Sequence, residues 1–335
     1  MYQTGDMLAT KWRASPPRVQ RAPWVPRFQE AQRSQLMSAS LRRDVRSREI
    51  RDSDIPFLAE FLGKGLGYPT GYYLQILERL AQRPIPTGFP RYGYLMENGD
   101  NIVGAIILIF TEFQQPDFCN IRCHVTAWYV EPYYRPFGTL FFWKALKLKG
   151  VTYLNISARP SARSFLELHG FSKYADGQFL AVPALNIAFA AFDNQVKVVG
   201  ADTAPAGHFD SFEQDLLLAH AGYGCLCLWC TTPERAYPFV FHGRYFKGFI
   251  PGVQLVYCRD VKDFVRFAAP IGLYLASHGK FFVRIDSNGP IPGLFGWYFD
   301  GMEPRYYKGT KPRLGDLAYT QAVMAPFVRR RIIDP

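Results

Sequence analysis

A chain of 335 residues with 48% hydrophobic and 20% charged residues has the composition of a globular protein, which excludes the disordered and fibrous classes. This length exceeds one ordinary core and favours two domains of about 150 residues each. Residues 1–50 hold ten Lys/Arg against four Asp/Glu, so +6 of the net charge of +11 lies there and +5 remains for the other 285 residues. The charge of the folded body therefore gives little reason to expect nucleic-acid binding.

The first residues have the character of a tail. Residues 1–45 are basic, contain prolines and show little periodicity, so we expect a flexible, solvated segment, with contact to a membrane surface or to nucleic acid as the alternative. No apolar stretch near Met1 resembles a secretory signal. The longest apolar runs, 102–110 and 180–192, fall short of the ~20 residues that span a bilayer. We expect a cytoplasmic protein without a transmembrane segment.

One alternating run and two helical runs follow the tail. Residues 46–51 alternate polar and apolar side chains, which predicts a short strand. A helix is predicted within 52–63, because Ser53 or Asp54 can cap it, Pro56 is tolerated in its first turn, and apolar side chains recur at helical spacing. A second helix is predicted over 72–81, after a glycine-rich link.

Two strand-like runs, 91–97 and 101–113, are joined by Asn98-Gly99-Asp100. Asn-Gly is a strong hairpin signal, because both residues tolerate positive φ. We therefore expect an antiparallel pair, then a loop over 114–120 and a further strand over 121–130.

The stretch 129–140 ends that strand and leads into a helix predicted over 141–149. Its turn contains Arg135 and Gly138, so backbone N–H groups before the helix would converge on one point in space. Converging amides at a helix N-terminus bind diphosphate groups. The sequence therefore predicts an anion-binding site here.

The spacing of this stretch resembles the coenzyme A motif of the GNAT acyltransferase superfamily. In that motif a valine and a proline end a strand, and Arg/Gln-x-x-Gly-x-Gly/Ala follows. Two positions depart from it: Leu140 stands where the family prefers Gly or Ala, and Pro136 removes one backbone donor. The matching residues are Val130, Pro132, Arg135 and Gly138.

A second part of the resemblance follows, around a strand predicted over 153–157 and a short helix predicted over 161–168. Family members commonly carry Asn-x-x-Ala-x-x-x-Tyr-x-x-x-Gly-Phe here, with the tyrosine acting as general acid toward the departing thiolate. In this chain Arg159 replaces the asparagine and Leu166 replaces the tyrosine, so the usual acid is absent. The matching residues are Ala162, Gly170 and Phe171, and Gly170 is also suited to the left-handed position that ends a helix.

The resemblance implies an α+β fold over residues 46–181, with a mixed, mostly antiparallel sheet flanked by helices. It implies acetyl-CoA or a longer acyl-CoA as donor, and no metal. It further implies that Tyr68, Tyr72 and Tyr73 line the acceptor site and that a backbone N–H near 129–130 serves the carbonyl oxygen of the acyl group. The residues implied for acyl-CoA binding are Tyr129, Val130, Arg135, Phe137, Gly138, Thr139, Leu140, Arg159 and Ala162.

His124 is the predicted general base. Some histone-modifying members of the family place a glutamate eleven residues before the Arg/Gln of the motif, and His124 holds that position here. Its unperturbed pKa of about 6.5 suits the task. His124 and Val130 share strand parity, so both would face the cleft if no bulge intervenes. Glu131 and Glu112 are the alternative bases, and a histidine that only packs inside the sheet is the alternative interpretation.

Residues 182–335 have an element order that resembles a second unit of this kind. No Arg/Gln-x-x-Gly follows its strand ending at Arg259. We therefore expect a degenerate second acyltransferase-like domain that does not bind coenzyme A. The predicted elements are a helix over 212–220, strands over 225–231, 237–246 and 253–259, a helix over 262–278 broken at Pro270, and strands over 281–286 and 296–307.

The cysteines do not form an obvious metal site. In a strand, Cys225 and Cys227 face one side and Cys230 the other, so one ion could not collect all three. We expect buried thiols that pack as small hydrophobic groups, and the same for Cys119 and Cys123.

The leading hypothesis is an N-acyltransferase that moves a group other than aminoacyl from acyl-CoA to a small-molecule or peptide amine, without a nucleic-acid partner. A non-catalytic acyl-CoA-binding or regulatory protein is the first alternative, because the usual tyrosine is absent. A tandem-domain transferase that uses aminoacyl-tRNA in cell-wall synthesis is the second, and it would need a basic groove. The sequence leaves the acceptor and the acyl length open.

Overall fold

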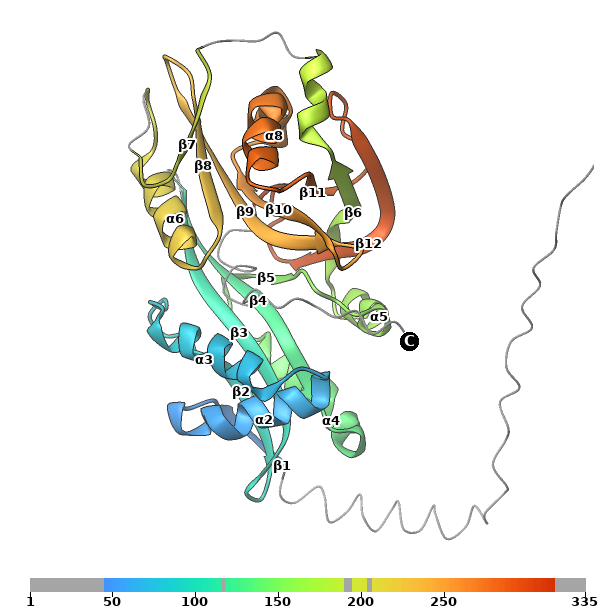
Figure 1. Ribbon diagram of the computed structural model, residues 1–335. Coiled ribbons are helices and arrows are strands. Elements are labelled where there is room, and N and C mark those ends of the chain that lie inside the picture. Colours follow the sequence, from blue (N-terminus) through green and yellow to red (C-terminus); the bar gives the residue numbers. More distant parts are fainter. Residues whose placement is uncertain (1–44, 116–117, 190–194, 204–206, 317–335) are drawn as a thin grey trace, which may run out of the picture. The chain divides into compact units, whose positions relative to one another are not determined.

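A computed structural model describes residues 45–115, 118–189, 195–203 and 207–316, which belong to one compact unit (Figure 1). The predicted tail lies outside these residues apart from Val45. Across the described ranges, no helix is both long and apolar enough to cross a membrane.

The first half follows the predicted order, with local differences. The hairpin turn is confirmed, with Gly99 at φ +59. The loop predicted over 114–120 is too long, because the strands on either side extend into it and Gln114 pairs with Cys119. One helix begins at Arg135 and not at 141, because Pro136 is tolerated in a first turn. The elements are β1 (Val45–Glu49), η1 (Asp52–Asp54), α2 (Ile55–Leu66), α3 (Thr70–Gln82), β2 (Gly93–Asn98), β3 (Asn101–Gln115), β4 (Phe118–Val130), η2 (Pro132–Tyr134), α4 (Arg135–Ala145), β5 (Val151–Asn155), α5 (Pro160–Leu168) and β6 (Ser172–Ala181).

The second half also keeps the predicted order of elements. The helix predicted over 262–278 is divided at Phe267 and not at Pro270, because Pro270 lies in the first turn of the second piece, where no N–H is needed. The elements are η3 (Pro183–Phe189), β7 (Lys197–Gly200), α6 (Ser211–Gly222), β8 (Leu226–Thr231), β9 (Ala236–Phe246), β10 (Ile250–Cys258), α7 (Val261–Arg266), α8 (Ala268–Ser277), β11 (Phe282–Ser287) and β12 (Gly296–Lys308).

All the strands form one 12-stranded sheet in the order β1-β2-β3-β4-β5-β12-β6-β11-β10-β9-β8-β7. Among the described strands, β4 pairs with β5 in parallel and β10 pairs with β11 in parallel, and the other pairs are antiparallel. The predicted α+β class with a mixed, mostly antiparallel sheet is confirmed.

The strand order is symmetric about its centre. The order β5 to β1 on one side matches β11 to β7 on the other, so each half contributes five strands in the same arrangement. The last strand of each half lies in the other half: β12 pairs with β5, and β6 pairs with β11. The sheet therefore runs through the domain boundary predicted near residue 182, which remains a prediction.

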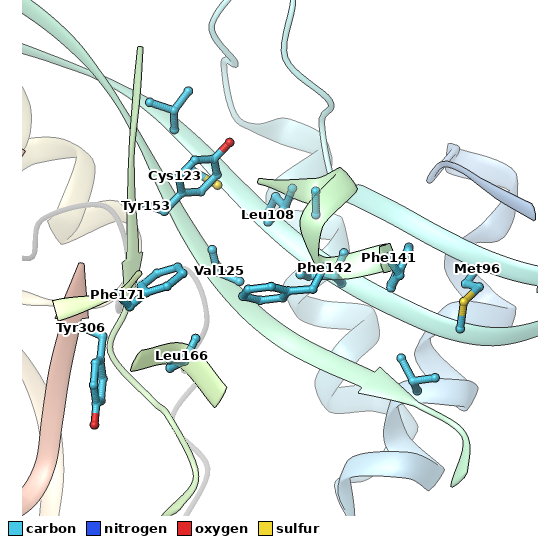
Figure 2. Close-up of a cluster of buried hydrophobic side chains, with 14 of the residues drawn as sticks. Met96, Leu108, Cys123, Val125, Phe141, Phe142, Tyr153, Leu166, Phe171 and Tyr306 are labelled. Atoms are coloured by element: carbon cyan, nitrogen blue, oxygen red, sulfur yellow. The ribbon is translucent and has the colours of Figure 1, made fainter. Parts of the chain in front are cut away.

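Helices cover both faces of each half of the sheet. In the first half, α2 and α3 bury apolar side chains such as Leu58 and Leu77 against one face. On the other face, Phe141 and Phe142 of α4 and Leu166 of α5 pack with β4 and β5, as Figure 2 shows. In the second half, α6 covers one face, and α7 and α8 cover the other.

Candidate functional site

The central parallel strands β4 and β5 separate toward their C-terminal ends. Their pairing runs from Ile121–Val151 to His124–Leu154 and stops there. β4 continues to Val130, whereas β5 ends at Asn155. We call the opening beside the last residues of β4 the wedge.

A β-bulge reverses the alternation of β4 next to the wedge. Ala127 has φ 44, and the register between β3 and β4 shifts at this point. As a result Val125 and Val130 both pack under α4, although an odd number of positions separates them. The prediction that His124 and Val130 share a face is therefore wrong, and His124 lies on the face opposite α4.

The backbone of β4 directs one donor into the wedge. The N–H of Glu131 donates to the carbonyl oxygen of Val103 on β3, at 3.0 Å. Successive N–H groups of a strand point to opposite edges. The N–H of Val130 therefore points to the edge that β5 has left, where a carbonyl oxygen in the wedge would meet it.

The N-terminus of α4 lies directly after this strand. The N–H of Arg135 donates to the carbonyl oxygen of Pro132, and Pro136 has no N–H, so Phe137 holds the remaining free donor of the first turn. No side chain caps this helix, and its first turn carries no acidic residue. Both features leave the positive end of the helix available to an anion.

Gly138 leaves room beside this donor. A Cβ at this position would lie 3.7 Å from Val130 Cγ2 and 3.8 Å from Trp128 Cζ2, which are ordinary contact distances. Packing within the protein therefore does not require glycine. Glycine also destabilises a helix by about 1 kcal/mol relative to alanine, so its presence here needs another reason. A ligand that approaches the backbone closely would require it.

Trp128 is a site residue that the sequence did not reveal. Its ring packs between Phe142 of α4 and Phe165 of α5, with centroids 4.8 Å apart in both cases. Its Nε1 is buried without a hydrogen-bond partner among the described residues. A buried N–H donor without a partner is rare in folded proteins and fits a site that a ligand completes.

The end of α2 closes the opposite side of the wedge. The guanidinium of Arg159, before α5, donates to the carbonyl oxygen of Leu66 at 3.0 Å. Gly65 sits on the Tyr129 ring, since a Cβ there would lie 2.2 Å from that ring. Of the residues implied for acyl-CoA binding, Val130 and Gly138 are buried, Tyr129, Phe137 and Ala162 are half-buried, and Arg135, Thr139, Leu140 and Arg159 are exposed.

Three tyrosines near this point form a ring cluster. Tyr72 stacks on Tyr68 with centroids 4.9 Å apart and meets Tyr73 edge-on at 5.1 Å. Arg159 lies close enough to Tyr73 to affect its ionisation electrostatically. The tyrosines predicted to contact an acceptor therefore lie beside the wedge, on the face covered by α2 and α3.

The properties of His124 disagree with the predicted role of general base. The residue is 2% exposed, and its Nδ1 has no partner among the described residues. Burial, with Arg305 nearby as a smaller cause, lowers the pKa of His124 to about 3. A base this weak cannot hold a proton taken from an amine near pH 7. The interpretation as a packed histidine fits better.

Acid unfolding tests this assignment. An unfolded histidine binds a proton below pH about 6.5, whereas folded His124 stays neutral down to about 3, so the stability of the protein should fall across this window as pH decreases. His124→Gln should remove part of that loss, up to about 3 kcal/mol between pH 7 and pH 4.5, and should retain most of the turnover. Urea unfolding at pH 7 and pH 4.5 measures this, with exposed His278→Gln as the control that should change nothing. A steep loss of turnover in His124→Gln would restore the base role.

The equivalent position in the second half differs. The helix after β10 is α7, and the carboxylate of Asp260 accepts a hydrogen bond from the N–H of Lys262 at its N-terminus. Asp263 adds a second carboxylate to the first turn. These groups occupy and neutralise the helix end, which supports the prediction of a silent second half.

The cysteines lie where strand parity places them. Cys225 and Cys227 pack in the core under α6, and Cys230 packs on the other face. Burial raises the pKa of the Cys225 thiol to about 12. No group of metal-ligating side chains gathers within the described residues.

Comparisons with known proteins agree on the fold. No protein-family model matches the chain, and no curated protein matches it. A solved structure from Pyrococcus horikoshii, provisionally described as an acetyltransferase, is 15% identical, with a TM-score of 0.50 over 83% of this chain and 94% of that one. A GCN5-related N-acetyltransferase from Anabaena variabilis is 7% identical, with a TM-score of 0.52 over 78% of this chain and 72% of that one. Both alignments extend beyond the first half, and the chain therefore has the fold of the GCN5-related N-acetyltransferases.

Proposed function

We propose that this protein transfers an acyl group from acyl-CoA to an amine. The observation that supports the proposal best is the wedge between β4 and β5 with the uncapped N-terminus of α4 beside it. The similarity of its fold to that of the GCN5-related N-acetyltransferases also supports the proposal.

The chain supplies binding and orientation. When bound, acyl-CoA would supply an activated acyl group with a thiolate as leaving group. The free N–H of Phe137 and the positive end of the α4 dipole would hold the diphosphate at the helix N-terminus. The N–H of Val130 would donate to the carbonyl oxygen as negative charge develops on it. The buried Nε1 of Trp128 would donate to a polar group of the same ligand.

The amine would enter from the face of α2 and α3. The α4 face beside the strands is filled by a close-packed apolar cluster that includes Phe141, Phe142 and Leu166 (Figure 2). The ring cluster of Tyr68, Tyr72 and Tyr73 lies on the entry face. The amine and acyl-CoA would therefore approach from opposite faces of the sheet and meet in the wedge.

Thermal unfolding with acyl-CoA tests binding. Acetyl-CoA and longer acyl-CoAs should raise the melting temperature, because a ligand that binds only the folded state stabilises it. Acetyl-pantetheine, which lacks the diphosphate, should raise it much less. No shift with any acyl-CoA would remove the proposal.

A non-catalytic acyl-CoA-binding protein is the second candidate. Leu166, which stands in place of the usual acid, is 2% exposed within the apolar cluster and offers no proton, and His124 is neutral. Thiol release from acyl-CoA in the presence of a pool of amines separates the two functions. An enzyme releases thiol in proportion to the amine, whereas a binder shows the melting shift without release.

A further inference from the structure

A small hollow lies on the second half of the sheet. Arg244 of β9 and Arg284 of β11 line it together with Leu180 of β6. Gly252 of β10 lies between Arg244 and Phe282 in the register, and Phe282 approaches it so closely that a Cβ there would lie 2.8 Å from the Phe282 carbonyl oxygen. We call this feature the arginine hollow.

The charges around the arginine hollow do not balance. Arg305 Nε donates to the buried carboxylate of Asp286 at 2.8 Å, and Arg284 donates to Glu303 at 2.7 Å. Arg244 is half-buried and has no hydrogen-bond or ion-pair partner among the described residues. Three guanidinium groups therefore face two carboxylates, which leaves one positive charge on Arg244.

Without a bound ligand, this excess positive charge is electrostatically unfavourable. Burial, together with the neighbouring charges of Arg284 and Arg305, lowers the pKa of Arg244 to about 10. The group is still a cation at pH 7. A bound anion would supply the missing negative charge.

The arginine hollow lies next to the acceptor side of the wedge. Tyr72 of the ring cluster is close enough to influence Arg244 electrostatically. Arg305 donates to the carbonyl oxygen of Ile156, directly after β5. The electrostatic influence of Tyr72 on Arg244 and the hydrogen bond from Arg305, a neighbour of the hollow, therefore relate the hollow to the ring cluster and to the end of β5.

We propose that the acceptor is a small amine that also carries a carboxylate, such as a free amino acid, and that Arg244 and Arg284 bind this carboxylate. The inference rests on the proposed acyltransferase function. A single excess positive charge matches a carboxylate better than a doubly charged phosphate. The planar guanidinium can also bind a carboxylate through two parallel hydrogen bonds.

The same arginines would help to deprotonate the amine. Nearby positive charge disfavours an ammonium group and lowers its pKa, so the proton can pass to water without a side-chain base. The amine nitrogen then forms a bond to the acyl carbon, the carbon–sulfur bond breaks, and the departing thiolate takes up the proton that the nitrogen releases as the amide forms. This step needs no imidazole, in agreement with the burial of His124.

Paired acceptors test the inference on the full chain. Thiol release with acetyl-CoA is measured for glycine against glycinamide and for phenylalanine against its amide. The acids should be preferred in kcat/KM by at least about tenfold, the effect of hydrogen bonds to a charged group. Amides have the more readily deprotonated amines, so this preference cannot come from amine reactivity.

Arg244→Met should abolish the preference for the acids, and it should lower the turnover of the amides less than that of the acids. Acyl-CoA should still raise the melting temperature of this variant, which would show that it folds. Arg235→Met, on the exposed residue just before the same strand, should behave as wild type. Equal use of acid and amide by wild type, or an unchanged preference in Arg244→Met, would overturn the inference and leave the acyltransferase proposal standing. No thiol release with any acceptor would overturn both.

Discussion

Gly138→Glu should abolish the rise in melting temperature that acyl-CoA produces. The new carboxylate would lie at the N-terminus of α4, where the free N–H of Phe137 and the helix dipole would otherwise hold the diphosphate. Its negative charge would repel the diphosphate and occupy the donor, and binding should weaken by at least about 100-fold. Thermal unfolding over a range of acyl-CoA concentrations measures the effect.

The folded state should tolerate this substitution. The Cβ has room, with its nearest neighbours at 3.7 and 3.8 Å. A carboxylate in the first turn of a helix is favourable by about 0.3–1 kcal/mol, and replacing glycine there adds helix propensity. The melting temperature without ligand should therefore stay level or rise, which separates lost binding from lost folding.

Gly71→Glu is the matched control. Gly71 lies in the first turn of α3 with open space around it, so the same charge is placed at another helix N-terminus. This variant should keep the full acyl-CoA shift. A full shift in Gly138→Glu would show that the diphosphate does not lie at α4.

Local signals explain why the order of elements was predictable. Asn98-Gly99 fixes a hairpin through its own φ preferences, and Gly170, at φ +82, ends α5. The motif around Arg135 and Gly138 lies within one strand and the helix that follows it. Each of these signals concerns neighbours in sequence, so a single chain is enough to read it.

The parts that were missed depend on contacts distant in sequence. No glycine or proline in the sequence indicates the bulge at Ala127. Without the bulge, simple alternation put His124 on the same face as Val130, which is wrong. The exchange of β6 and β12 between the halves is seen only in the strand pairing of the folded sheet, and no local sequence pattern indicates it. The arginine hollow takes its side chains from β9 and β11, and no motif connects Arg244 with Arg284.

Arg305→Met should destabilise the protein by about 3–5 kcal/mol, because it leaves a buried carboxylate without its cation. Arg305 is 2% exposed and Asp286 is equally buried. The guanidinium also donates to the carbonyl oxygen of Ile156, so it links β12 and β11 to the end of β5. Because β12 and β6 are the exchanged strands, this ion pair lies where the two halves join. Denaturant unfolding at pH 7 measures the loss.

Two further variants identify the cause. Arg48→Met removes an ion pair with Asp54 and Glu97 whose arginine is partly exposed, and it should cost no more than about 1 kcal/mol. The double variant Arg305→Met/Asp286→Leu removes both buried charges, so it should be more stable than Arg305→Met alone. If Arg305→Met cost as little as Arg48→Met, the join between the halves would depend on strand pairing and apolar packing instead. If the double variant were the least stable of the three, the loss would come from the shape of the packed side chains, because no unpaired charge would remain to explain it.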